Sequence, residues 1–308
     1  MVKSLVTGST GFIGTHLVPH LQSMGDEVVG WGHQTGPEIT DQTAMAAALD
    51  GLELDAVFHL AGQSNVHQSW EHPGPTFATN AVGTLALLAA LRSTNPTARV
   101  LLMSSAEVYG KVASTELPIT EDHKLTPASP YGASKAAAEH LAVQAWHGCG
   151  QEVITGRAFN HIGPGQAPSF VTSAIAERIA RNEHDGHTEV PVGNLTATRD
   201  FIDVRDAVVA HRQLMLRGQP GEAYNICRGE EVAVATLADL MLRASTTAQT
   251  FVTDPDRLRP SDVPRHFGSP VKIRQATGWT ASTPFEDSVQ DVLNDWRSKI
   301  AEEKRPQT

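Results

Sequence analysis

Cysteine is scarce in this sequence, and acidic residues outnumber basic ones. The two cysteines, Cys149 and Cys227, are too few for a disulfide framework, although a single bridge between them is left open, and they fit a reducing compartment. Lysine and arginine total 24 against 34 aspartate and glutamate residues, which gives a formal net charge of -10. This charge argues against a broad basic surface, so we expect no nucleic acid and no membrane among the partners.

Long apolar runs are also missing. Residues 1–18 are interrupted by Gly8, Ser9, Thr10 and Gly11, unlike the hydrophobic region of a secretion signal. No segment approaches the length and apolar character of a membrane span, so a cytoplasmic protein is expected. The absence of a Gly-x-Ser-x-Gly sequence argues against a serine hydrolase.

Short apolar runs alternate with helically periodic stretches through the first half of the chain. This alternation predicts an α/β protein with a doubly wound parallel sheet of the dinucleotide-binding (Rossmann) kind, complete by about residue 160. The expected strands are 4–7, 28–31, 56–61, 99–104 and 152–158, and the expected helices are 12–24, 41–49, 78–92 and 134–147.

The sequence changes in character after residue 158. Glycines and prolines predict a loop at 163–168, four prolines predict an extended segment at 254–270, and helices are expected at 169–181 and 285–299. We predict a Rossmann domain and a smaller C-terminal α/β substrate lobe. The domain comprises residues 1–160 with a returning segment at about 196–225, the lobe comprises 161–195 and 226–300, and 301–308 form a tail.

A glycine-rich turn lies between the first expected strand and the first expected helix. Gly8 permits the sharp turn, Gly11 lets the backbone approach a pyrophosphate, and Gly14 lets the helix pack closely on the strand. The N-terminus of the helix, at Phe12 and Ile13, then faces the phosphates. The turn therefore predicts a dinucleotide site.

The Gly-x-x-Gly-x-x-Gly spacing of this turn resembles the short-chain dehydrogenase/reductase superfamily, specifically its extended branch that acts on nucleotide sugars. Trp31, Gly32 and His33 stand where an acidic residue would bind the ribose 2'-hydroxyl of NAD. Without an acid there to repel a 2'-phosphate, we expect NADP(H) or NAD(H), with the balance toward NADP(H). His33 is either a cofactor contact or a plain surface imidazole.

Tyr131 and Lys135 are four residues apart, on one face of an expected helix. A phenol has a pKa near 10 and is a poor base at neutral pH. We expect the Lys135 ammonium and the charge of an oxidised nicotinamide to lower the pKa of Tyr131. Tyr131 could then exchange a proton with a substrate oxygen while hydride moves at the same carbon.

Ser105 ends the fourth expected strand, where ligands of an open parallel sheet bind. Ser105, Tyr131 and Lys135 match the catalytic triad of the superfamily in order and spacing. The same resemblance implies further cofactor contacts at Leu60, Ala61 and Ile162, and a structural or cofactor role for Asn80.

Four stretches resemble GDP-mannose 4,6-dehydratases and GDP-4-keto-6-deoxymannose reductases: 157–166, 192–195, 198–206 and 257–260. With Gly278-Trp279 and Pro284 the resemblance covers nearly the whole chain. It implies a GDP-sugar whose diphosphate is held by Asn160, Arg199 and Arg259, because guanidinium groups meet phosphate oxygens in a fork. A surface ion pair stays the alternative for each arginine, above all for Arg199 beside Asp200. The other implied substrate contacts are Gln63, Ser105, Glu107 and Val171.

The Ser105-Ala106-Glu107 sequence bears on the reaction. Nucleotide-sugar dehydratases typically carry Thr-Asp-Glu or Thr-Ser-Glu there, because they must move a second proton. Glu107 could act as a base, but Ala106 offers no proton. We therefore expect NAD(P)H-dependent reduction of the 4-keto group of a GDP-4-keto-6-deoxy-hexose. The alternatives are a GDP-mannose 4,6-dehydratase, a 4-epimerase, and a non-catalytic NAD(P) sensor, against which the intact triad argues.

The helices expected at 78–92 and 134–147 have small, apolar faces. Related enzymes commonly dimerise through these two helices, so a homodimer is implied, unless the helices merely cover the sheet. His16 and His20 are spaced as zinc ligands can be, but no third ligand accompanies them, and no metal site is expected.

Overall fold

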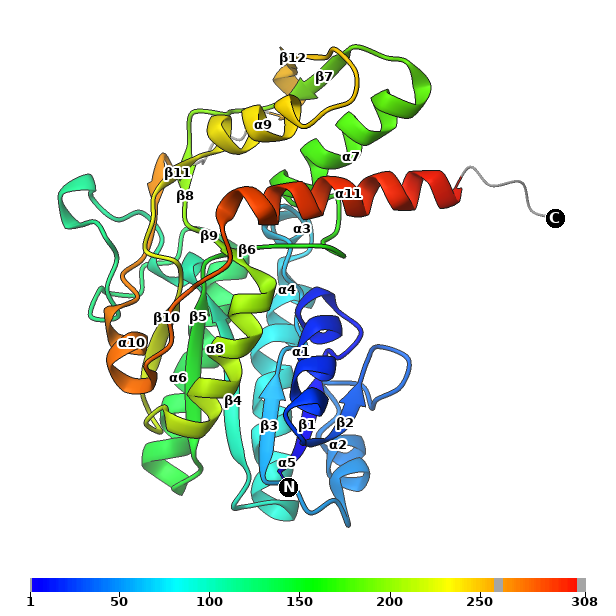
Figure 1. Ribbon diagram of the computed structural model, residues 1–308. Coiled ribbons are helices and arrows are strands. Elements are labelled where there is room, and N and C mark those ends of the chain that lie inside the picture. The colour runs from blue at the N-terminus through cyan, green and yellow to red at the C-terminus, as the bar shows by residue number, and fades with distance from the viewer. Residues whose placement is uncertain (1, 258–262, 304–308) are drawn as a thin grey trace.

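The central sheet has six parallel strands in the order β10-β5-β4-β3-β1-β2. The structure is a computed structural model, and it describes residues 2–257 and 263–303 (Figure 1). The strands are β1 (Lys3–Thr7), β2 (Glu27–Trp31), β3 (Ala56–His59), β4 (Arg99–Ser105), β5 (Val153–Ala158) and β10 (Ala223–Ile226). The predicted doubly wound parallel sheet is confirmed.

Helices cover both faces of this sheet, because alternate residues of each buried strand point to opposite faces. In β1, Val6 joins one apolar core and Leu5 joins the other. The first core is covered by α1 (Phe12–Ser23), α8 (Val204–Arg217) and α10 (Val271–Thr277), and the second by α2 (Gln42–Leu49), α5 (Gly83–Thr94) and α6 (Pro130–Cys149).

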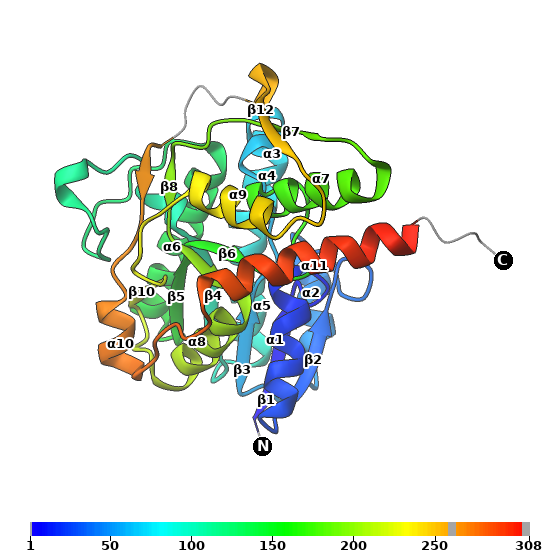
Figure 2. The ribbon, with the colours of Figure 1, turned by 45° about the horizontal axis from the view of Figure 1, so that its top comes forward.

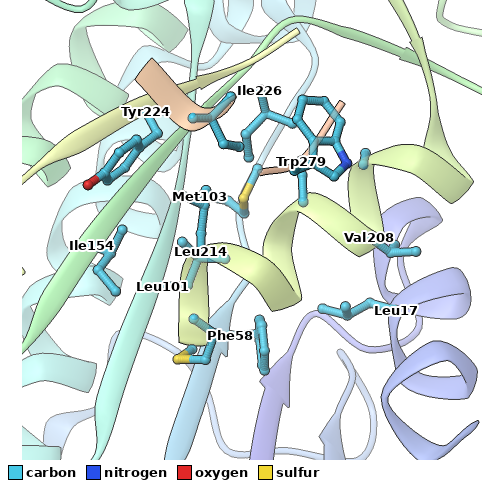
Figure 3. Close-up of a cluster of buried hydrophobic side chains, with 14 of the residues drawn as sticks. Leu17, Phe58, Leu101, Met103, Ile154, Val208, Leu214, Tyr224, Ile226 and Trp279 are labelled. Atoms are coloured by element: carbon cyan, nitrogen blue, oxygen red, sulfur yellow. The ribbon is translucent and has the colours of Figure 1, made fainter. Parts of the chain in front are cut away.

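Figure 3 shows the first core, where Leu17 of α1 and Leu214 of α8 pack toward Phe58 and Leu101 of the sheet. These four side chains are at most 1% exposed. Full burial of each such side chain stabilises the fold by roughly 1.5–3 kcal/mol. Trp279 closes the cluster, and its ring N–H donates to the main-chain oxygen of Asp206 at 3.1 Å.

The sheet is not complete at residue 160, contrary to the sequence-based expectation. The sixth strand, β10, pairs with β5 and follows α8, so both elements come from the returning segment. Between β5 and α8 the chain forms two short paired strands, β6 (Asn160–Ile162) and β9 (Phe201–Asp203). The apolar run at 152–158 did not reveal that β5 has a neighbour on each side.

A second group of elements lies beyond the carboxyl ends of the central strands (Figures 1 and 2). Its core joins three helices and one strand pair. These elements are α7 (Val171–Asp185), α9 (Val234–Arg243), α11 (Phe285–Glu303), β7 (Glu189–Val192) and β12 (Thr250–Thr253). A small sheet of β8 (Thr198–Arg199), β11 (Val232–Ala233) and β13 (Arg265–His266) lies beside them. The division into two domains at the predicted boundaries stays a prediction.

Three helical expectations need correction. The α6 helix begins at Pro130 rather than 134, because the Ser129 hydroxyl accepts from the Gly132 N–H at 3.0 Å and caps it. The α11 helix continues to Glu303, into the expected tail. The third concerns the helix expected at 78–92. Its first five residues form a π-helical turn, η1 (Ala78–Val82), before α5 begins, and two further helices, α3 (Val66–Glu71) and α4 (Pro73–Phe77), come before it.

The α4, η1 and α5 segments follow one another without a break. Together, Pro73–Thr94 form a 22-residue helix that is long and apolar enough to cross a membrane by length and composition. The expectation that no segment approaches a span is therefore wrong as stated. Of its most apolar window, 56% is buried inside the protein, which is also the pattern of a core helix.

Candidate active site

The strand order reverses at β1, which has β2 on one side and β3 on the other. In open α/β sheets the ligand crevice lies at such a switch point, outside the carboxyl ends of the strands. Gly8 follows β1 with a φ of +73°, and a Cβ there would lie 2.8 Å from the Ala61 nitrogen. The glycine turn and the segment Leu60–Ala61 after β3 therefore form adjoining walls of this crevice.

The first turn of α1 offers main-chain N–H groups at the switch point. Gly11 is the N-cap residue and provides no side-chain cap, so the N–H groups that begin at Phe12, Ile13 and Gly14 lack side-chain acceptors. A Cβ on Gly14 would lie 2.3 Å from the Gly8 oxygen, so only glycine allows this approach. An uncapped helix N-terminus beside a glycine turn fits the pyrophosphate of a dinucleotide.

The end of β2 carries no carboxylate. Trp31 ends the strand, and Gly32 begins a tight turn in which its N–H donates to the Thr35 hydroxyl at 2.8 Å. His33 is exposed on that turn. Its role as a cofactor contact stays a prediction.

Asn80, in the π-helical turn η1, joins the crevice wall to α6. Its side-chain oxygen accepts from the Gln63 N–H at 2.8 Å, and its amide donates to the Gln63 oxygen at 3.0 Å and to the Ser134 hydroxyl at 2.9 Å. These hydrogen bonds give Asn80 a place in the packing of the crevice wall, and its role as a cofactor contact stays a prediction. The Gln63 side-chain oxygen is buried without a partner among the described residues, and its role as a substrate contact stays a prediction.

Ser105, Tyr131 and Lys135 come together at the carboxyl end of β4. Each is at most 9% exposed, and the Ser105 hydroxyl is hydrogen-bonded to the Tyr131 phenol. The Lys135 amine donates to the Met103 oxygen at 2.9 Å. The Tyr131 N–H donates to the Ser69 hydroxyl of α3 at 3.1 Å, which fixes the start of α6.

The protonation of the pair differs from the sequence-based expectation. Burial raises the pKa of Tyr131 to about 12, the Ser105 hydrogen bond opposes the rise, and the Glu107 charge adds to it. Burial lowers the pKa of Lys135 to about 8, and Glu139 opposes that change. The expectation that Lys135 lowers the pKa of Tyr131 is thus wrong for the protein without cofactor, because desolvation of the phenolate dominates. The phenol is protonated at neutral pH and can donate.

The segment after Ser105 is a single 3₁₀ turn, η2 (Ala106–Tyr109). Ser105 caps it by accepting from the Glu107 N–H at 3.2 Å. Ala106 is buried in an apolar cluster with Tyr109 and Ile119. Glu107 is half-buried, and its charge acts on Tyr131. The site therefore holds one carboxylate beside the phenol and no proton donor at position 106.

The predicted substrate contacts lie on the elements that join the two parts of the fold. Asn160 is half-buried on β6, and Ile162 on the same strand is buried. Arg199 on β8 donates to the main-chain oxygens of Thr198 and Val263, at 2.8 and 2.7 Å. Val171 begins α7 and is 37% exposed. Arg259 lies outside the described residues, and diphosphate binding by these side chains stays a prediction.

Comparison with known proteins identifies the family. Residues 32–292 match the family model described as GDP-mannose 4,6 dehydratase. The chain belongs to this family. The predicted membership in the nucleotide-sugar branch of the short-chain dehydrogenases/reductases is thereby confirmed.

Relatives in this family carry several activities. GDP-6-deoxy-D-mannose reductase of Pseudomonas aeruginosa is 36% identical over 304 residues, covering 98% of this chain and 99% of the relative. A dTDP-glucose 4,6-dehydratase of Xanthomonas campestris is 30% identical over 337 residues, covering 96% and 93%.

Two solved structures share the fold. RMD from Pseudomonas aeruginosa complexed with NADPH superposes with a TM-score of 0.90 at 34% identity, covering 97% of this chain and 100% of that one. UDP-glucose 4-epimerase from Thermus thermophilus, in complex with NAD, gives a TM-score of 0.85 at 27% identity, covering 96% and 99%.

Sequence reasoning missed two side chains in this member of the GDP-mannose 4,6-dehydratase family. Glu139 and Arg157 form a buried ion pair, with a closest N–O distance of 2.8 Å, beneath the triad. The four-residue spacing from Lys135 to Glu139 was a visible signal, since it repeats the spacing from Tyr131 to Lys135. The partner Arg157 is far away in sequence and could not be paired from spacing.

Proposed function

We propose that this chain uses NADPH to reduce the 4-keto group of a GDP-4-keto-6-deoxy-hexose. The observation that carries the proposal is the buried phenol of Tyr131, whose pKa burial raises, beside Ser105 at the carboxyl end of β4. A phenol in this state can give a proton to a carbonyl oxygen that is being reduced. The 36% identity to a GDP-6-deoxy-D-mannose reductase over nearly the whole of both chains supports the choice of substrate.

The crevice residues fit a reduced dinucleotide. When bound, its nicotinamide would supply the hydride. The N–H groups that begin α1 at Phe12, Ile13 and Gly14 would hold the phosphates. The end of β2 carries no acid to repel a 2'-phosphate, and the exposed His33 just after it is proposed to contact one, which supports NADPH.

Each member of the triad then has one role. The Ser105 hydroxyl donates to the substrate carbonyl and orients it. The Tyr131 phenol gives its proton to the same oxygen. The charged Lys135 stabilises the phenolate that remains, at a site whose burial strengthens the attraction.

A GDP-mannose 4,6-dehydratase is the second candidate, because Glu107 lies close enough to Tyr131 to influence its pKa. A dehydratase also needs an acid that expels the hydroxyl, and position 106 is a buried alanine. The deciding experiment is mass spectrometry of products from a panel of nucleotide sugars. Consumption of GDP-4-keto-6-deoxymannose only with NADPH supports the reductase. Conversion of GDP-mannose alone to a 4-keto product overturns it.

The substrate diphosphate is proposed to lie between Asn160, Arg199 and Arg259, with Gln63 and Val171 lining the approach. Two arginines suit an acidic protein that must hold a diphosphate. Replacement of Arg259 by alanine should raise KM for the nucleotide sugar far more than KM for the cofactor. Equal changes in both constants would remove Arg259 from the substrate site.

A cytoplasmic homodimer completes the proposal. Both cysteines are free thiols, which suits a reducing compartment. Four apolar side chains are more than two-fifths exposed on the α4–α6 face of the molecule: Phe77, Val82, Leu85 and Val143. Such a patch on neighbouring helices suits an interface with a second copy. Light scattering that gives the mass of a monomer at micromolar concentration would overturn the dimer.

A further inference from the structure

A carboxylate is buried on the same helix as the catalytic lysine. Glu139 lies one helical turn after Lys135 on α6 and is 4% exposed. Tyr131, Lys135 and Glu139 follow at intervals of four, so they share one face of the helix. A buried charge is costly unless it is paired and hydrogen-bonded, so the partners of Glu139 indicate its use.

Those partners come from two strands of the sheet. The Nε of Arg157, on β5, donates to both oxygens of Glu139 at 3.1 Å, and a terminal nitrogen donates to one at 2.8 Å. The hydroxyl of Ser104, on β4, donates to the other oxygen. Ser104 immediately precedes the catalytic Ser105. One carboxylate therefore joins α6, which carries Tyr131 and Lys135, to the strand that carries Ser105.

The connection extends to the turn that carries Glu107. The remaining nitrogen of Arg157 donates to the Tyr109 hydroxyl at 2.8 Å and to the Glu121 main-chain oxygen at 3.1 Å. The Tyr109 hydroxyl donates in turn to Asn225 on β10 at 2.6 Å. Each donor and acceptor of this network is satisfied by a group in a defined position, which makes it rigid.

The charged groups near Lys135 include one carboxylate that influences its pKa, and that carboxylate belongs to Glu139. His59, on β3, interacts electrostatically with the amine, and burial lowers the pKa of this imidazole to about 3, so it is neutral. Burial lowers the pKa of Lys135 to about 8, and the Glu139 charge is the influence that opposes it. Arg157 on β5 acts on Glu139, and Glu107 on η2 acts on Tyr131.

We propose that Glu139 is a positioning residue, whose carboxylate, fixed by Arg157 and Ser104, keeps the Lys135 ammonium charged and aligned with Tyr131. The importance of this role for catalysis rests on the proposed function. Its effect on Lys135 is testable without substrate, because the amine lies in the wall of the cofactor crevice. A Cβ on Gly62, just after β3, would lie 3.2 Å from the Lys135 nitrogen.

The test is the affinity for NADPH, measured by fluorescence between pH 6 and 10 in wild type and in Glu139→Gln. The amide can still accept from Arg157 but carries no charge. At pH 6 we expect the two proteins to bind NADPH with similar affinity. As the pH rises, both should lose binding, and the midpoint, the pH at which half of the binding is lost, should be lower in Glu139→Gln by about one pH unit or more. In turnover at pH 8, kcat should fall more than KM rises. Coincident midpoints in the two folded proteins would overturn the proposal.

Glu183→Gln is the matched control. Glu183 on α7 forms a similar two-pronged ion pair with Arg297 of α11, with both N–O distances 2.7 Å, away from the crevice. Its loss should lower stability and leave the NADPH midpoint unchanged. A shift in this variant as large as that in Glu139→Gln would assign the effect to general destabilisation and overturn the proposal.

A second variant covers the possibility that unpaired Arg157 prevents folding of Glu139→Gln. Glu139→Gln/Arg157→Met removes both charges, and neutral replacements of buried ion pairs are often tolerated. This double variant should fold and still show the lower midpoint. A wild-type midpoint there would overturn the role of Glu139. If wild type binds NADPH but reduces no keto sugar, the proposed function fails while the NADPH titration still decides this proposal.

Discussion

The carbonyl oxygen of Gly8 occupies the space that a Cβ of residue 14 would need. The two would be 2.3 Å apart, and the Ser9 Cα would be 2.7 Å away. Both neighbours are backbone, which cannot move aside as a flexible side chain does. The turn that begins at Gly8 and the helix α1 can therefore lie this close together only because residue 14 has no Cβ.

Gly14→Ala should weaken NADPH binding at least tenfold, because α1, whose first N–H groups are proposed to hold the phosphates, must move away from the glycine turn. Fluorescence titration with NADPH measures this change. Gly74→Ala is the matched control, since nothing lies within 4 Å of its Cβ position in the α4 helix. It should leave binding unchanged. A Gly14→Ala protein that binds NADPH like wild type would contradict the assignment of the turn.

Tyr131→Phe should remove turnover while NADPH still binds. Loss of a general acid typically costs about 10²–10⁴ in rate. The aromatic ring keeps the packing of the buried site, because only the hydroxyl bonded to Ser105 is lost. Stopped-flow oxidation of NADPH with the keto sugar measures the chemical step. Retained turnover would exclude Tyr131 as the proton donor.

The alkaline side of the pH profile should report Lys135. The folded protein holds this amine with a pKa of about 8, so the ammonium is present below that pH and is lost above it. We expect kcat/KM for the keto sugar to fall as the pH rises through about 8, since kcat/KM follows the free enzyme. The pKa of Tyr131, about 12, lies too high to produce this limb. A flat profile to pH 10 would contradict the assignment.

A buried imidazole should make the fold sensitive to acid. His211 on α8 is fully buried 6.1 Å from the His161 ring, and both its ring nitrogens lack partners among the described residues. Burial lowers its pKa well below 6.5, so the unfolded chain binds the proton first and stability falls as the pH drops below 6.5.

His211→Leu should abolish this part of the pH dependence. When the pH is lowered from 7.5 to 5, the free energy of unfolding of wild type should fall by about 2 kcal/mol more than that of His211→Leu. Urea unfolding at the two pH values measures the difference. His187→Leu, at an exposed position, should keep the wild-type dependence. Equal losses in wild type and His211→Leu would contradict the prediction.

Leu85→Glu should split the proposed dimer. Leu85 is 46% exposed on α5, and a carboxylate there would meet its own copy or apolar side chains across an isologous contact. Multi-angle light scattering at several concentrations measures the mass. Leu216→Glu is the control, because Leu216 is equally exposed but lies on α8, on the other side of the sheet. Both variants giving the wild-type mass would place the interface elsewhere.

The features that the sequence made predictable are those with a local physical cause. The turn from Gly8 to Gly14 and the helix that carries Tyr131 and Lys135 depend on spacing alone. The strand positions followed because each apolar run is bounded by loops. The start of α6 was misplaced by four residues, since the hydrogen bond from Gly132 to Ser129 that caps the helix is visible only in the folded chain.

Contacts between distant segments were not predictable in the same way. The ion pair of Glu139 and Arg157 and the addition of β10 to the edge of β5 depend on tertiary packing. The protonation of Tyr131 was expected in the wrong direction, because the charge of Lys135 was visible in sequence but the depth of burial was not. Desolvation is a property of the folded chain.

The late arrival of β10 has a consequence for synthesis of the protein on the ribosome. β5 ends at Ala158 and its outer neighbour begins at Ala223, after the whole of α7 and α8 has been made. At roughly 5–20 residues per second, β5 is a bare sheet edge for several seconds. An uncovered edge invites pairing with another chain. A nascent or truncated product that stops before residue 223 would therefore be aggregation-prone, although its glycine-rich turn, Gly8 to Gly14, was among the first parts to emerge.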